Sequence, residues 1–156
     1  MVRISLKELL LTGRFGPVEL GMARAAVAAA LGPPDDEGYF RKRVAQVWKY
    51  GSIELHFDRD DAVFLIHSDD DSLDAPQGGR NVDLDPWIIS SALRRDAALA
   101  ELSRAGMPCT TTEYAWNANT DEVRTASGVA LLFEGEDDTS PPDRHLIAMS
   151  RSRPPA

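Results

Sequence analysis

The chain has 156 residues, 43% hydrophobic and 27% charged, a composition typical of one globular domain or of two small halves that share a core. Its formal net charge of −8 opposes nucleic-acid binding, because affinity for a polyanion depends on Lys and Arg neutralising phosphates. The same charge favours a basic protein partner, or serves only solubility.

Two short helices are predicted near the start of the chain. Ser5 followed three residues later by Glu8 forms a capping box, which predicts a helix that stops at Gly13. The alanine-rich segment 23–31 predicts a second helix, because alanine has the highest helix propensity. Gly32 and the two prolines after it end this helix.

Strands follow the second helix. Apolar and polar residues alternate in segments 46–50 and 53–57, while 62–66 is apolar throughout, so three strands are expected. The aspartate-rich segment 58–61 is the predicted hairpin loop between the last two of them. Segment 69–86 shows no periodicity and is predicted to be an acidic connection.

The second half of the chain is predicted to repeat this order. Asp96 is expected to cap a helix over 97–105, which ends at Gly106 in a Schellman-type motif. The strands expected after it are 111–116, 122–125, 128–133 and 146–149.

One short pattern occurs twice at a constant offset. Ile53, Leu55 and Phe57 recur 76 positions later as Val129, Leu131 and Phe133. We therefore expect an α+β fold in which two tandem helix–helix–antiparallel-sheet repeats pack as one body. The expected boundaries are 1–68 for the first repeat, 69–86 for the connection, 87–150 for the second repeat and 151–156 for a frayed tail.

The first half also resembles a known family. Gly21-Met22, then Val27, then Leu31-Gly32-Pro33-Pro34 is similar to the Gly-Met…Val…Leu-Gly-x-Pro motif of SmpA/OmlA-type domains. The tandem arrangement resembles β-lactamase inhibitory proteins, which carry two helix-plus-sheet repeats. That resemblance implies a concave sheet face that grips another protein.

Aromatic residues fall on alternating positions of matching strands in the two halves. If they share an exposed face with the polar residues beside them, they form a platform for a protein partner, since Trp and Tyr are common at interface hot spots. Alternatively they fill the core between sheet and helices. The predicted partner-binding residues, acidic loop included, are Trp48, Tyr50, Glu54, His56, Asp58, Asp60, Asp61, Tyr114 and Trp116.

No residue pattern predicts catalysis, a metal site or a cofactor. The aspartate-rich loops lack the glycine and terminal glutamate of a calcium loop. Our first hypothesis is a non-enzymatic binding protein of immunity or inhibitor type, which takes a basic partner on its sheet face and acidic loops. The alternative is an enzyme or small-ligand binder with a pocket at the seam, near His56 and His67. A third is a structural role through self-association at a strand edge.

Few residues indicate the cellular compartment of the protein or its assembly state. A single cysteine, Cys109, excludes an intrachain disulfide and a cysteine-cluster zinc site. The apolar run 9–11 is too short for a membrane span. We therefore expect a cytoplasmic protein that binds no membrane, and we leave its oligomeric state open.

Overall fold

The computed structural model describes residues 1–39, 45–69, 74–114 and 117–153. Within these ranges ten strands form two sheets, accompanied by three α-helices and one 3₁₀ helix. The helices are α1 (Leu6–Thr12), α2 (Arg24–Leu31), α3 (Arg95–Arg104) and the 3₁₀ helix η1 (Pro141–Asp143). The strands are β1 (Val2–Ser5), β2 (Asp36–Gly38), β3 (Val47–Tyr50), β4 (Ile53–Phe57), β5 (Val63–Ser68), β6 (Val82–Asp85), β7 (Cys109–Glu113), β8 (Thr120–Thr125), β9 (Val129–Glu134) and β10 (His145–Ser152).

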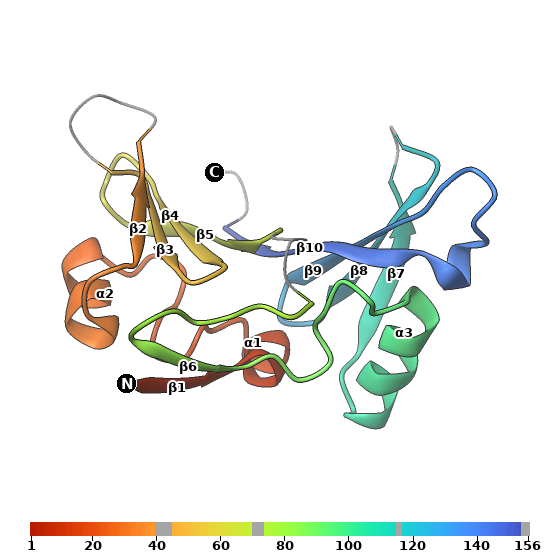
Figure 1. Cartoon of the computed structure of the whole chain (residues 1–156), viewed down its shortest axis with the longest axis horizontal. Helices are drawn as coiled ribbons and strands as arrows, with labels where there is room; N and C mark the ends of the chain where they lie inside the picture. The colour runs from red at the N-terminus through yellow and green to blue at the C-terminus, as the bar shows by residue number, and fades with distance from the viewer. Residues whose placement is uncertain (40–44, 70–73, 115–116, 154–156) are drawn as a thin grey trace.

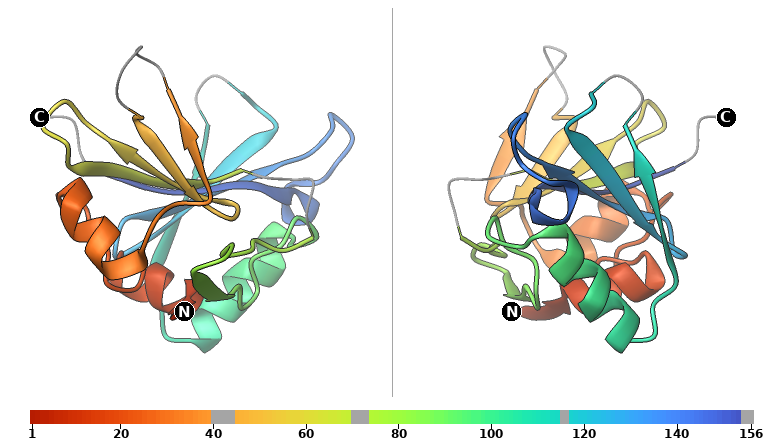
Figure 2. Two further views of the ribbon diagram at one scale, coloured as in Figure 1. Left: turned by 60° about the vertical axis from the view of Figure 1, so that its left-hand side comes forward. Right: turned by 90° about the vertical axis from the view of Figure 1, so that its right-hand side faces the viewer.

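The large sheet is antiparallel and has the strand order β2-β3-β4-β5-β10-β9-β8-β7. Its first half-sheet, β2 to β5, and its second half-sheet, β7 to β10, each run strand by strand in chain order. They meet at a seam where β10 pairs with β5, from Met149 opposite Ser68 to Ser152 opposite Leu65. The three α-helices lie on one side of this curved sheet (Figure 1, Figure 2).

The expectation of two tandem helix–helix–sheet repeats is wrong. The structure is mostly sheet: two α-helices precede the first half-sheet, but α3 is the single α-helix described before the second. Where a further helix would have to lie, Trp87 has a φ of 52° and the Ile89 N–H donates to the Pro86 carbonyl, which makes a turn. In addition, β1 pairs in parallel with β6 in a separate small sheet that the repeat plan did not contain.

Predictions based on local signals were confirmed for the first two helices. Ser5 caps α1, its Oγ accepting a hydrogen bond from the Glu8 N–H, and Gly13 ends the helix with a φ of 78°. Gly32 ends α2. The predicted cap of α3 is wrong, because the helix begins at Arg95 and Asp96 lies inside its first turn.

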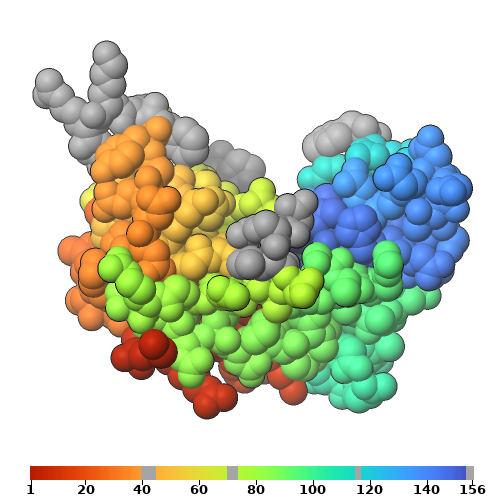
Figure 3. Space-filling model, viewed as in Figure 1, coloured from red at the N-terminus to blue at the C-terminus, as the bar shows by residue number. Residues whose placement is uncertain are grey.

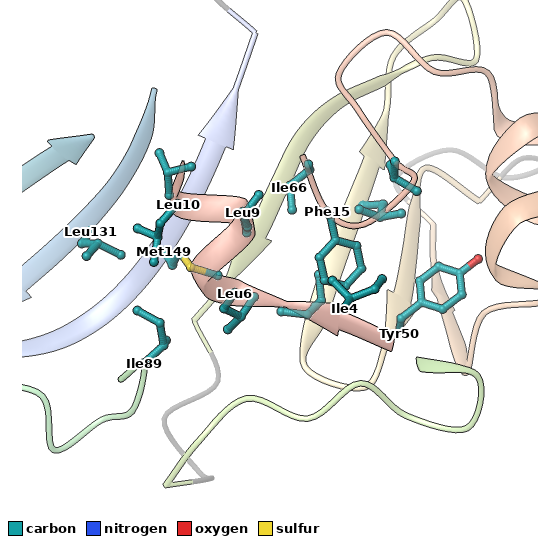
Figure 4. Packing of buried hydrophobic residues seen from close by; sticks show 14 of the residues in the cluster. Ile4, Leu6, Leu9, Leu10, Phe15, Tyr50, Ile66, Ile89, Leu131 and Met149 are labelled. Atoms are coloured by element: carbon teal, nitrogen blue, oxygen red, sulfur yellow. The ribbon is translucent and has the colours of Figure 1, made fainter. Parts of the chain in front are cut away.

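The core lies between the large sheet and the helices. Its buried side chains come from α1, from both half-sheets and from β1, as the cluster around Leu9 and Phe15 shows (Figure 4). Helix α1 spans the two halves, because the Ser127 Oγ in the β8–β9 turn donates to the carbonyl of Leu10. None of the described helices has the length and apolar content needed to cross a membrane.

Candidate functional site

The face of the large sheet opposite the helices is the candidate site. Side chains alternate along a strand, so Leu131 and Phe133 of β9 point into the core while Ala130 and Leu132 point the other way. Cross-strand partners share a face, which extends this surface over both half-sheets. We call it the open face; it comprises Asp36, Val47, Lys49, Glu54, His56, Leu65, His67, Thr110, Thr112, Thr120, Glu122, Arg124, Ala130, Leu132, Glu134, His145, Ala148, Ser150 and Ser152.

The middle of the open face is uncharged and carries small or apolar side chains. Ala130 lies opposite Ser150, and Leu132 lies opposite Ala148. Leu65 continues this strip across the seam. The space-filling view shows the molecule hollowed between the two half-sheets, above the helices (Figure 3). We refer to these five residues as the floor.

The margins of the open face are charged. Lys49 and Arg124 carry its positive charges. They are outnumbered by carboxylates on the same face and directly after β5, namely Asp36, Glu54, Asp69, Glu122 and Glu134. The described part of this surface is therefore acidic when its histidines are neutral.

A polar cluster lies on the margin formed by the first half-sheet. Glu54 of β4 is directly opposite His67 of β5, and the His67 Nε2 lies 3.3 Å from the Asp69 Oδ2. One ligand-type atom from each of these three residues lies within 4.8 Å of the other two. The two Glu54 oxygens also approach neighbours, with Oε2 3.5 Å from the His56 Nε2 and Oε1 3.7 Å from the Lys49 Nζ.

Sequence reasoning missed this cluster. His67 lies in β5 and Asp69 directly after that strand, but Glu54 joins them only through the pairing of β4 with β5. The hairpin at 58–61 was predicted, but not which residues of its two strands lie opposite each other. A predicted register would have placed Glu54 opposite His67 and so indicated the cluster.

The structure places Trp48 and Tyr50 in the core rather than on the open face. Trp48 is 8% exposed and packs edge-to-face against Phe57, with ring centroids 5.1 Å apart. Tyr50 is fully buried, and its hydroxyl donates to the Gly32 carbonyl over 2.8 Å. Burial, helped by the charge of Asp35, raises the pKa of Tyr50 to about 12. Neither side chain is available to a partner in the folded protein.

The other predicted aromatic residues belong to the second half-sheet. Tyr114 directly follows β7 and is half-buried, and its backbone N–H donates to the Thr120 carbonyl. Trp116 lies outside the described residues. The structure therefore does not bring the four aromatic side chains together into one platform on its described part.

Two of the three aspartates in the predicted acidic loop bind other parts of the protein with their carboxylates. The Asp58 carboxylate accepts N–H bonds from Asp60 and Ala62 and contacts Arg153. The bond from Ala62, followed by the contact with Arg153, lowers the pKa of Asp58. Asp61 has a left-handed backbone and pairs with a helix arginine, whereas Asp60 is exposed. Unlike Trp48 and Tyr50, the other described residues of the predicted set are at least partly exposed, so a partner could reach them: Glu54, His56, Asp58, Asp60, Asp61 and Tyr114.

A small hollow lies at one end of the seam. It is lined by Ser68, Asp69, Leu146 and Met149, among others, and its volume is about 30 Å³. That is space for a few water molecules, whereas small-molecule sites typically enclose roughly 300–1,000 Å³. His56 and His67 are not among its lining residues. The hollow gives the small-ligand alternative little support.

The chain matches no known family model, no curated protein and no solved structure. The resemblance to SmpA/OmlA-type domains stays a prediction from a short motif, and the resemblance to β-lactamase inhibitory proteins stays a prediction from the twofold pattern. Function is therefore inferred from the open face itself.

Proposed function

We propose that the protein is a non-enzymatic binding module of immunity or inhibitor type, whose open face receives a basic segment of another protein. The observation that carries this proposal is the hollowed eight-stranded face with its small apolar floor and charged margins. A cytoplasmic location belongs to the same proposal, because Cys109 has no second cysteine in this chain for a disulfide.

The floor has the composition of an interface centre. Protein interfaces are depleted of charge at the core and polar at the rim, which is the order found from Leu132 outward to Glu122 and Arg124. Ala130 and Ala148 add little side-chain bulk, so the main chain of a partner can approach the sheet closely. Together these features fit a protruding loop or strand of another protein.

The margins select the sign of the partner's charge. Among the described residues on the open face or directly after β5 there are five carboxylates and two cations, and the whole chain carries −8. Opposite fields accelerate encounter and disfavour like-charged competitors, so a basic segment is the complementary occupant. Its association rate should fall as salt rises, since surface charges are screened.

The test compares two variants that add the same charge at different places. Ala148→Arg puts a guanidinium in the floor, whereas Ala100→Arg puts one on the exposed side of α3. The partner is first captured by tagged wild-type protein from its native lysate, identified by mass spectrometry and purified. Calorimetry then measures each variant's affinity for it.

We expect Ala148→Arg to weaken binding at least about tenfold, because it buries an unpaired charge in the interface, and Ala100→Arg to bind as wild type does. Equal affinities for the two variants would place binding elsewhere and reject the proposal. Association rates that do not change between low and high salt would reject its electrostatic part. A wild-type bait that captures no stoichiometric partner would count against the whole proposal.

A further inference from the structure

We infer that Glu54, His67 and Asp69 form a binding site for a divalent transition-metal ion such as Zn²⁺. The site lies on the margin of the open face and needs no partner protein, so it goes beyond the proposed function. No sequence motif predicts this site, because its ligands come from two strands and from the residue after β5.

The distances suit direct coordination. Zn²⁺ binds imidazole nitrogen and carboxylate oxygen at about 2.0–2.2 Å, so two ligands of a tetrahedral site lie roughly 3.3–3.5 Å apart. His67 Nε2 and Asp69 Oδ2 are already 3.3 Å apart. The remaining separations among the three ligand atoms do not exceed 4.8 Å, and small side-chain rotations shorten them.

The donor set fits a first-row divalent ion. One neutral imidazole and two carboxylates supply two negative charges, which balance the charge of the ion. Imidazole favours Zn²⁺ and its neighbours over Mg²⁺, which prefers oxygen ligands and keeps its waters. Asp69 is 64% exposed and gives the ion an open route from solvent.

The neighbours of the site help in different ways. The His56 Nε2 approaches one oxygen of Glu54 and can hold the carboxylate in place, as outer contacts of metal ligands commonly do. The Lys49 Nζ approaches the other oxygen, and its charge opposes the ion. The Lys49 side chain is 44% exposed, so its ammonium group can turn into solvent when a cation binds.

The alternative is that Glu54 and His67 are only an ordinary cross-strand pair that binds no metal. A second pair of this kind in the same sheet allows the two explanations to be compared. Glu134 of β9 lies opposite His145 of β10 in the same arrangement as Glu54 and His67. Among the described residues no third histidine, cysteine or acidic ligand converges on that pair. His145 is therefore a matched control within the same chain.

The experiment titrates the purified full chain with Zn²⁺ alone, by calorimetry, and follows the imidazole signals by NMR. We expect one ion per chain, with shifts at His67 and none at His145. His67→Gln and Glu54→Gln should each weaken binding at least about tenfold, while His145→Gln should bind as wild type does. Excess Mg²⁺ should not displace the Zn²⁺.

Thermal unfolding in a chelator shows that each variant is folded, which separates a lost ligand from a lost structure. Absence of Zn²⁺ binding by the wild type up to about 1 mM would overturn the inference. Equal affinity of His67→Gln and wild type, or an equal loss in His145→Gln, would also overturn it. Because no partner is present in the titration, these results leave the proposed function untouched.

Discussion

Arg24 and Arg95 occupy matching places in the two halves of the molecule. Each is the first residue of its helix, and each backbone N–H donates over 2.9 Å to a carbonyl just before the last strand of its half-sheet, that of Asp61 or of Arg144. The backbone joint between helix and sheet is therefore the same in both halves.

The side chains complete the two joints differently. The Arg24 guanidinium lies 4.2 Å from the ring centroid of Phe57 and 5.1 Å from that of Trp48, and its Nε is 2.8 Å from an oxygen of the half-exposed Asp61. In the second joint Arg95 is 2.9 Å from Asp121, a β8 residue only 4% exposed.

The buried carboxylate of Asp121 needs a second cation. Arg144, which is also buried, binds its other oxygen over 2.9 Å. An isolated buried charge costs several kcal/mol, so the second joint is stable only while all three groups are present. In the first joint the Arg24 guanidinium contacts two aromatic rings and one carboxylate, so the loss of any one contact should lower stability only slightly. One backbone geometry thus supports a tolerant joint and an all-or-none joint.

The largest expected effect comes from removing the centre of the second joint. Asp121→Ala leaves the guanidinium groups of Arg95 and Arg144 without their shared carboxylate, and should cost about 3–5 kcal/mol of unfolding free energy. Denaturant titration measures the change. Asp96→Ala is the matched control, because Asp96 also pairs with Arg95 but is more than half exposed, and it should change stability by less than about 1 kcal/mol. Similar costs for the two variants would show that Asp121 is not the centre.

The first joint should respond more weakly. Arg24→Met keeps the aliphatic stem over the rings but removes the charge, and should cost about 1–2 kcal/mol. Asp61→Asn should cost less than about 1 kcal/mol, because this carboxylate is exposed to solvent. The same denaturant titration applies. If Arg24→Met destabilises as much as Asp121→Ala, the distinction between a tolerant and an all-or-none joint fails.

The smallest expected effect is on the pH dependence of stability, through Asp35 in the first half of the molecule. Asp35 accepts hydrogen bonds from the backbone N–H groups of Arg80 and Gly51 and from the Arg80 side chain. Partial burial raises the pKa of this carboxyl, but these bonds outweigh it and hold the pKa below its ordinary value of 3.8. A lowered pKa in the folded state means that Asp35 stabilises the fold above pH 3.8 and loses this effect as the pH falls through the lower, folded value.

Asp35→Asn should therefore be less stable than wild type at neutral pH, with a difference that narrows as the pH falls below 3.8. Thermal unfolding of both proteins across the acid range provides the measurement. A stability difference that stays constant down to the lowest pH would contradict the assigned role of this carboxylate.

The sequence predicted the features whose causes are local. The caps of α1, the glycine end of α2 and the alternation in β4 each depend on residues within one turn or one strand. The twofold pattern that begins at Ile53 and at Val129 does fall on corresponding strands, β4 and β9. Such local signals identify matching strands but do not show how many helices precede each half-sheet. The predicted helix–helix–sheet repeat was therefore wrong, although several of the predicted elements are present.

Features that depend on distant pairing could not be predicted. Val2 pairs with Val82, and nothing near either residue indicates a short parallel sheet. Alternation showed that Trp48 and Tyr50 lie on the same side of their strand. It did not show whether that side faces the core or solvent, because the polar residues between and beside them are compatible with both. The predicted strand 122–125 did not include Asp121, whose role depends on ion pairs with Arg95 and Arg144 from other parts of the chain. The candidate metal ligands became visible only with the register of β4 and β5.

The pairing of β5 with β10 also determines when the large sheet can be completed during synthesis of the chain. As the chain leaves the ribosome, Ser68 emerges long before Met149, its partner in the sheet. Until then one edge of β5 carries unpaired N–H and C=O groups, the kind of edge that recruits other chains. Pairings between such distant residues also slow folding. A growing chain therefore carries an unpaired strand edge from the synthesis of β5 until β10, the last of the described strands, has been made and pairs with it.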